Sequence, residues 1–222
     1  HNPAFWPVWL DQTMRSGFNY PNGSVYRYDT SNVNSLFNNQ VYNKGAITLH
    51  TLRWKIGDSA FFAGVKNYIS DSSLAFGFAR TPDLKAHLEA SYGQSLTKFF
   101  NDWIYGPGFP QIHTSWSMNG SNLTLNVTQI PSDTAVSFFE IPIPYRLTGN
   151  NIDTIIVVEP TSSFQAFNIP NLQGVTNVIF NPDDRIFARE LFTVDISETP
   201  AATDLTVFPN PTSAYLYLQN SE

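Results

Sequence analysis

The stretch SLTKFFNDWIYGPGFPQIHTSWSM, residues 95–118, holds the point at which this sequence changes its structural pattern. Its first half places large apolar side chains at helical spacing, as one buried face requires: Leu96, Phe99, Phe100, Trp103 and Ile104. The glycines and prolines of 106–110 break that helix. Beyond Pro110 apolar and polar residues alternate, which is typical of a strand. The sequence therefore predicts an α+β fold whose helical part ends at residue 110.

Besides one short helix near Phe5 to Arg15, three further helices are expected before this point. Residues 42–56 repeat apolar side chains at spacings of three and four, and Gly57 is a natural stop. Asp58 is expected to cap a second helix, with Phe61, Phe62, Val65, Tyr68 and Ile69 on its buried face. Thr81, followed by a proline, is expected to cap a third helix, which ends at Gly93.

The remainder of the chain has the pattern of a β-domain followed by a tail. Six short strands are expected between turns, at 112–118, 123–127, 141–147, 152–158, 164–169 and 175–180. Their number and spacing predict an Ig-like antiparallel β-sandwich. The expected domains are thus a helical part at 1–110, a sandwich at 111–197, and a linker with a truncated strand-rich tail at 198–222.

Composition excludes several classes of function. Only 14% of the residues are charged and the formal net charge is −6, so no basic stripe is present to bind nucleic acid. No apolar run approaches the roughly 20 residues of a membrane span. Cysteine is absent, which excludes thiolate metal sites and thiol catalysis.

Metal and nucleophile motifs are missing from the sequence. No H-E-x-x-H and no G-x-S-x-G segment occurs, and the acidic pair at 183–184 follows a proline, as in a turn. The four histidines are isolated and are interpreted as surface or core residues, not ligands: His1, His50, His87 and His113. No metal site is therefore predicted within this chain.

One segment invites a functional interpretation. Val41-Tyr-Asn-Lys-Gly-Ala46 opens the first amphipathic helix. Taken alone, Tyr42 is interpreted as a core tyrosine, Lys44 as a solvated side chain, and Gly45 as a site of close helix packing. The same segment, however, is the first of several landmarks that occur in a fixed order.

These landmarks run from residue 36 to 110: Tyr-x-Lys-Gly-Ala at 42–46, Leu-Arg at 52–53, Gly-Asp-x-x-Phe-Phe at 57–62, the helix start at Thr81, Tyr92-Gly93, and Phe99-Phe100-x-x-Trp103 leading to Gly106-x-Gly-x-Pro110. In this order they resemble the gluzincin aminopeptidases, the family of aminopeptidase N and leukotriene hydrolase. The β-domain resembles, more weakly, the sandwich that follows the helical region in some members.

The resemblance implies a mechanism of which this chain holds a part. In that family the tyrosine matching Tyr42 donates a hydrogen bond to the oxyanion that forms when zinc-bound water attacks the peptide carbonyl. Tyr42 is thus the one catalytic residue expected here, and a phenol is a suitable neutral donor. The zinc ligands, the base and the residue that captures the substrate amine are expected upstream of His1, so this fragment is expected to be inactive and zinc-free. The parent's substrate would be a peptide.

A second resemblance concerns the end of the chain. Leu205-Thr-Val-Phe-Pro-Asn-Pro-Thr212 resembles the start of a type IX secretion sorting domain. It implies export by a Gram-negative cell to its surface or to the medium, with any signal peptide upstream of His1. The alternative to the peptidase interpretation is a non-catalytic binding or structural module, which a parent lacking H-E-x-x-H would favour. Substrate preference and oligomeric state are not encoded in any recognisable pattern.

Overall fold

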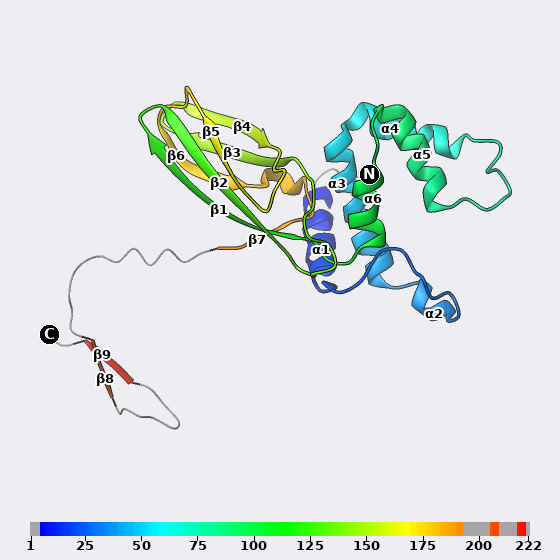
Figure 1. The fold of residues 1–222 in the computed structure, drawn as a ribbon, viewed down its shortest axis with the longest axis horizontal. Helices are drawn as coiled ribbons and strands as arrows, with labels where there is room; N and C mark the ends of the chain where they lie inside the picture. Colours follow the sequence, from blue (N-terminus) through cyan, green and yellow to red (C-terminus); the bar gives the residue numbers. More distant parts are fainter. Residues whose placement is uncertain (1–4, 193–204, 209–216, 221–222) are drawn as a thin grey trace. The chain divides into compact units, whose positions relative to one another are not determined.

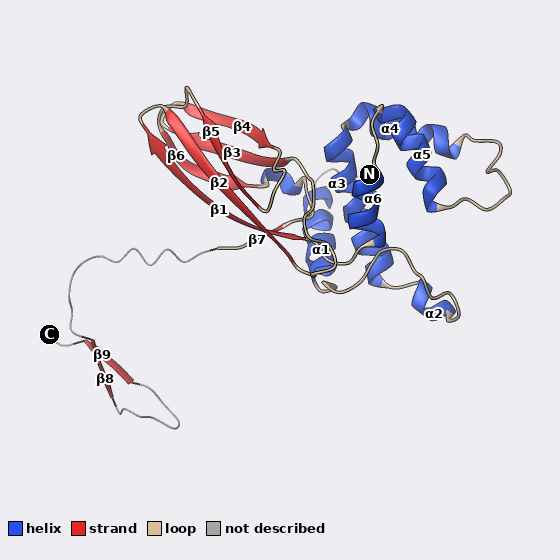
Figure 2. Cartoon of the chain, in the orientation of Figure 1, coloured by secondary structure: helices blue, strands red, loops and turns tan. Residues whose placement is uncertain are grey.

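The computed structural model describes residues 5–192, 205–208 and 217–220, and the chain divides into two compact units, 1–192 and 193–222. In the first unit the helices come first and the strands follow, so the predicted α+β class is confirmed (Figures 1 and 2). No helix in the described ranges is long and apolar enough to span a membrane.

The helical part uses both α and π geometry. Its α-helices are α1 (Trp6–Phe18), α2 (Val33–Leu36), α3 (Gly45–Ile56), α4 (Asp58–Ile69), α5 (Thr81–Tyr92) and α6 (Thr97–Phe100). Two single π-turns are present. The turn η2 (Gln40–Lys44) directly precedes α3, and η3 (Asn101–Tyr105) directly follows α6. Such turns are rare and occur often at functional sites. Gly57 ends α3 with a φ of 79°, which confirms the predicted stop.

The strands form two sheets. Their bounds are β1 (Pro110–Asn119), β2 (Asn122–Pro131), β3 (Ile143–Gly149), β4 (Ile152–Val158), β5 (Phe164–Ile169), β6 (Val175–Phe180) and β7 (Arg189–Glu190), with the short 3₁₀ turn η4 (Pro182–Asp184) before β7. The sheet orders are β5-β2-β1-β7 and β4-β3-β6. All pairs are antiparallel except β1 with β7. A hydrogen bond of 2.8 Å between the hydroxyls of Thr114 and Tyr145 links the two sheets.

A buried aromatic cluster joins the helices to the sandwich. Trp103, on η3, lies 4.8 Å from Phe139 of the β-domain and 5.6 Å from Phe99, between ring centroids. Phe187, before β7, packs at 6.3 Å from Trp103, and its backbone N–H donates to Thr51 Oγ1 on α3 at 2.8 Å. Helices and strands therefore share one core, which fixes α3 against the sandwich.

The predicted buried face of α4 is wrong at two positions. Phe62 and Ile69 are 53% and 75% exposed. The seam between α4 and α5 runs instead through Gly64, where an added Cβ would lie 3.0 Å from the Cα of Leu88. Because the two backbones approach so closely at this glycine, the larger residues of α4 rotate away from the seam. The guanidinium carbon of Arg53 lies over Phe62, 4.9 Å from the centroid of the phenyl ring.

The helix starts also differ in detail from the expectation. Asp58 is the first residue of α4, not its cap, and its carboxylate pairs with Arg53 at 2.7 Å. Thr81 is likewise the first residue of α5, and Arg80 occupies the cap position. Asp83 accepts the Arg80 backbone N–H at 2.7 Å, so a carboxylate one turn later caps the end that the threonine was predicted to cap.

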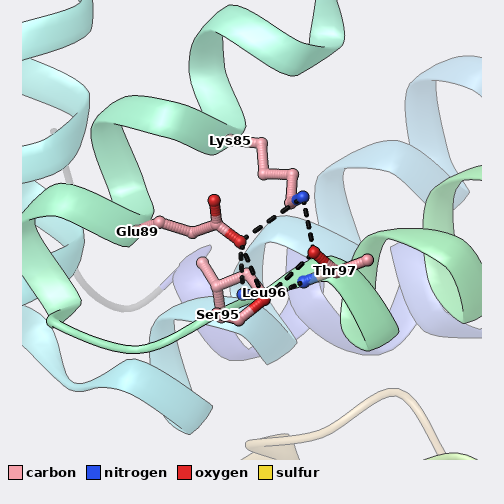
Figure 3. Close-up of polar contacts among 5 residues, drawn as sticks. All are labelled: Lys85, Glu89, Ser95, Leu96 and Thr97. Atoms are coloured by element: carbon pink, nitrogen blue, oxygen red, sulfur yellow. Dashed lines mark hydrogen bonds and ion pairs between the residues drawn. The ribbon is translucent and has the colours of Figure 1, made fainter.

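A polar cluster fixes the turn between α5 and α6 (Figure 3). One oxygen of Glu89 accepts the Leu96 backbone N–H at 2.6 Å and the Ser95 hydroxyl at 3.3 Å. Lys85 lies 3.4 Å from the same carboxylate and donates to the Thr97 hydroxyl at 2.7 Å. The cluster sets where α6 begins, and with it the position of η3 and the aromatic cluster.

We expect Glu89→Ala to lower the free energy of unfolding by about 1–2 kcal/mol, because the Leu96 N–H loses its charged acceptor. Urea unfolding followed by circular dichroism measures the change. Glu159, an exposed carboxylate, provides the control. The free energy of unfolding of Glu159→Ala should stay within about 0.5 kcal/mol of that of the unsubstituted chain. Equal effects of the two substitutions would contradict this role of Glu89.

The second unit is described only at β8 (Leu205–Phe208) and β9 (Tyr217–Asn220), which pair antiparallel. The linker predicted at 200–202 and the Pro-Asn-Pro of 209–211 lie outside the described residues. The secretion tail and the domain boundaries at 110 and 197 stay predictions.

Candidate functional site

Tyr42 lies on the π-turn η2, at the point where the chain enters α3. Its side chain is 59% exposed, so it is not the core tyrosine that its sequence context alone predicts. Its backbone N–H donates to the carbonyl of Asn38 at 3.1 Å. Among the described residues its hydroxyl has no hydrogen-bond partner. The phenol is therefore held by its backbone and is free to donate outward.

Tyr42 borders a groove of about 460 Å³. The lining comes from η2, α3, α4, α5 and η3 and from the loops before α2 and α5: Val25, Val41, Tyr42, Gly45, Ala46, Leu49, Tyr68, Ala79, Arg80, Thr81, Leu84 and Ile104. Most of this surface is apolar, and Tyr42, Tyr68, Arg80 and Thr81 are the lining residues that have polar side chains. Such a groove can hold an extended apolar segment beside a hydrogen-bond donor.

The turn that carries Tyr42 is tethered on both sides. Gln40 Oε1 accepts from Arg27 Nη2 at 2.9 Å, and Asn43 Nδ2 donates to the Ser16 hydroxyl on α1 at 2.6 Å. Lys44 Nζ donates to the backbone carbonyl of Gly23 at 2.7 Å. Three of the five residues of η2 thus bind segments that precede it by 13 to 27 residues.

Lys44 is fully buried, which corrects the prediction of a solvated side chain. Burial lowers the pKa of Lys44 from its ordinary 10.5 to about 8, although the charge of Asp133 opposes the shift. The sequence held a signal for this burial. Lys44 precedes Ile47, Thr48 and Thr51, all buried, by three, four and seven residues, which places it on the same helix face.

The lowered pKa predicts a pH dependence of stability. Between about pH 8 and pH 10.5 the unfolded chain binds a proton at Lys44 that the folded chain has released. The free energy of unfolding contributed by this group therefore rises with pH across that window, by about 3 kcal/mol in total. The difference in unfolding free energy between the unsubstituted chain and Lys44→Met should change by this amount between pH 7.5 and pH 10.5. A difference independent of pH would contradict the burial of the ammonium.

The described histidines are not grouped as metal ligands. His50 Nε2 lies 3.1 Å from the carbonyl of Asp184, and His87 Nε2 lies 3.0 Å from a carboxylate oxygen of Asp71. His113 lies on β1, and His1 is outside the described residues. In the described ranges no group of three or more His, Cys, Asp or Glu residues could hold a metal ion, so these residues do not fit a zinc site. Asp183 and Asp184 form the turn η4, as predicted.

Comparison with known proteins bears directly on this groove. Residues 22–103, which include η2 and most of the groove lining, match the family model described as Peptidase family M1 domain. Leucyl aminopeptidase of Saccharolobus solfataricus is 26% identical over 176 residues, which are 75% of this chain and 22% of that protein. Aminopeptidase N of Lactococcus lactis is 33% identical over 81 residues, 36% of this chain and 9% of that protein. These findings support a likeness of this segment to the M1 aminopeptidase family.

The fold agrees with the M1 match. A crystal structure of Legionella pneumophila aminopeptidase A in complex with aspartic acid superposes with a TM-score of 0.64 and 17% identity, covering 81% of this chain and 21% of that one. At this identity the likeness concerns the fold alone. The chain spans about a fifth of the length of the first of these relatives and of this structure. M1 peptidases are zinc-dependent in general, and the described residues lack the ligands for a metal.

Proposed function

We propose that this chain is the C-terminal part of a secreted zinc aminopeptidase, and that Tyr42 donates a hydrogen bond to the oxyanion formed during peptide hydrolysis. The observation that carries the proposal is the exposed phenol of Tyr42, with no partner among the described residues, on a groove inside the M1-matching segment. The helices of the groove are then one wall of the cleft that receives the peptide.

The chemistry suits a phenol in this place. When water adds to an amide carbonyl, the oxygen gains negative charge, and a donor already in position stabilises that charge with little reorganisation. The Tyr42 hydroxyl gives up no internal hydrogen bond in order to donate, and the tethered turn η2 holds its backbone. A donor of this kind lowers the barrier without taking or giving a proton.

Zinc, when bound in the parent protein, supplies a Lewis acid and an activated water. In this proposal its ligands and the general base belong to a part of the parent protein outside these 222 residues. The match of this chain to only about a fifth of the length of these longer relatives supports that division.

Export by the type IX route is part of the proposal. It rests on the resemblance of residues 205–212 to the start of a sorting domain and on the strand formed by Leu205–Phe208. The proposed location is the cell surface or the medium of a Gram-negative organism.

Metal content and turnover test the proposed function together. The parent polypeptide should contain one zinc per chain by mass spectrometry of the metal and should release amino acids from aminoacyl p-nitroanilides. The 222-residue chain alone should do neither, because the described residues hold no ligand set. The sequence preceding His1 should contain H-E-x-x-H and a further glutamate. A parent protein without that motif and without turnover would favour a binding or structural module.

A further inference from the structure

Burying the ammonium of Lys44 lowers the stability of the fold. The Lys44 side chain is 0% exposed, and among the described residues its ammonium donates to one backbone carbonyl, that of Gly23, at 2.7 Å. The charge of Asp133 offsets the effect of burial only in part. Removing an ammonium from water costs several kcal/mol unless its donors are matched. A methionine would fill a similar volume with no such cost. The contact with Gly23 therefore needs an explanation other than stability.

The geometry around Gly23 indicates what the contact fixes. Gly23 belongs to the loop between α1 and α2, and an added Cβ there would collide with the side-chain amide of Gln40. The same loop reaches Gln40 a second time through Arg27. The loop is thus fastened to the first residue of η2 and to its last. Tyr42 lies midway between these two fastened residues, with its own ring exposed.

We propose that Lys44 is a positioning residue for Tyr42: by holding the Gly23 carbonyl, its side chain locks the π-turn and keeps the Tyr42 hydroxyl in place at the groove. The proposal rests on the proposed function of Tyr42. Lys44 itself does not line the groove, so its effect on turnover passes through the position of the phenol.

Two other roles for Lys44, a stabilising hydrogen-bond network and a ligand site, fit the same contacts less well. The buried nitrogens Arg27 Nε and Gln40 Nε2 have no acceptor, so this cluster has more donors than acceptors and is not a saturated network built for stability. Lys44 is fully buried and does not line the groove beside Tyr42, so its ammonium is not presented to a ligand bound there. What remains is the mechanical connection between the loop and η2.

The test is a double-mutant cycle in the zinc-loaded parent polypeptide, with kcat and KM measured separately. Lys44→Met should lower kcat at least tenfold and leave KM within about twofold. In the Tyr42→Phe background the same substitution should lower kcat less than threefold, because the residue through which it acts is already inactive. Lys66, exposed on α4, provides the matched control, and Lys66→Met should leave kcat unchanged.

The outcomes separate this proposal from the function on which it rests. If Tyr42→Phe alone keeps normal turnover, the proposed function fails. If Tyr42→Phe is slow but Lys44→Met keeps normal kcat, Lys44 does not position Tyr42. The same holds if Lys44→Met lowers kcat equally in both backgrounds.

Amide hydrogen exchange of residues 40–44 should accelerate in Lys44→Met and not in Lys66→Met. If Lys44→Met does not fold, Gly23→Ala, which displaces the loop from Gln40, should give the same kinetic pattern.

Discussion

Tyr42→Phe should lower kcat of the parent polypeptide by about two to three orders of magnitude, with little change in KM. The hydroxyl is the only group removed, and a donor aimed at a developing oxyanion lowers the barrier by about 3–4 kcal/mol. Because the hydroxyl has no hydrogen-bond partner among the described residues and the ring is largely exposed, folding should be unaffected. Steady-state kinetics on an aminoacyl p-nitroanilide, together with thermal unfolding, measures both effects.

The control for this prediction is Tyr28→Phe. Tyr28 is also strongly exposed, and it is not among the residues that line the groove. Its hydroxyl donates to the carbonyl of Tyr105 over a long 3.4 Å, so the substitution removes one weak hydrogen bond. Turnover of Tyr28→Phe should stay within about threefold of the parent. A Tyr42→Phe enzyme as active as this control would contradict the oxyanion role.

Trp103→Ala should destabilise the chain by about 3–5 kcal/mol, the cost expected for deleting a buried indole. Trp103 is 0% exposed and contacts Phe99, Phe139 and Phe187, so the cavity would open where the helices meet the sandwich. The surrounding rings belong to different elements and cannot close the gap together. Urea unfolding should show the midpoint falling for helical and strand signals alike.

Trp103→Phe provides the matched control, because it keeps an aromatic ring in the same space. The indole N–H of Trp103 is buried without an acceptor, so its loss removes no hydrogen bond. The expected cost is at most about 2 kcal/mol, from the lost volume alone. If Trp103→Ala costs no more than Trp103→Phe, the aromatic cluster does not join the two parts as described.

Much of the fold was predictable because its signals are local. The change from helical to alternating spacing at Pro110 coincides with the start of β1, and each predicted strand core lies within or overlaps an observed strand. Gly57 ends α3 because only a residue tolerant of positive φ fits there. These features depend on residues a few positions apart, which is the range over which sequence spacing carries information.

The exposure of particular side chains was not predictable in the same way. Helical spacing placed Phe62 and Ile69 on one face with Phe61, but a close approach at Gly64 decides which face of α4 meets α5. The burial of Lys44 depends on the carbonyl of Gly23, 21 residues away. The place of Tyr42 on the groove likewise depends on α4 and α5, which follow it in the chain. Each of these facts arises from contacts that no short window of sequence contains.

Affinity for a transition-state mimic tests the role of Tyr42 most directly. A phosphinic dipeptide analogue carries a tetrahedral, negatively charged centre where the oxyanion forms, and its inhibition constant can be compared between the zinc-loaded parent polypeptide and its Tyr42→Phe variant. The account predicts that the substitution weakens this analogue by about 10²–10³-fold, in parallel with kcat/KM, while the affinity for a product amino acid changes less than about threefold. Equal affinity of the analogue for both proteins would contradict it.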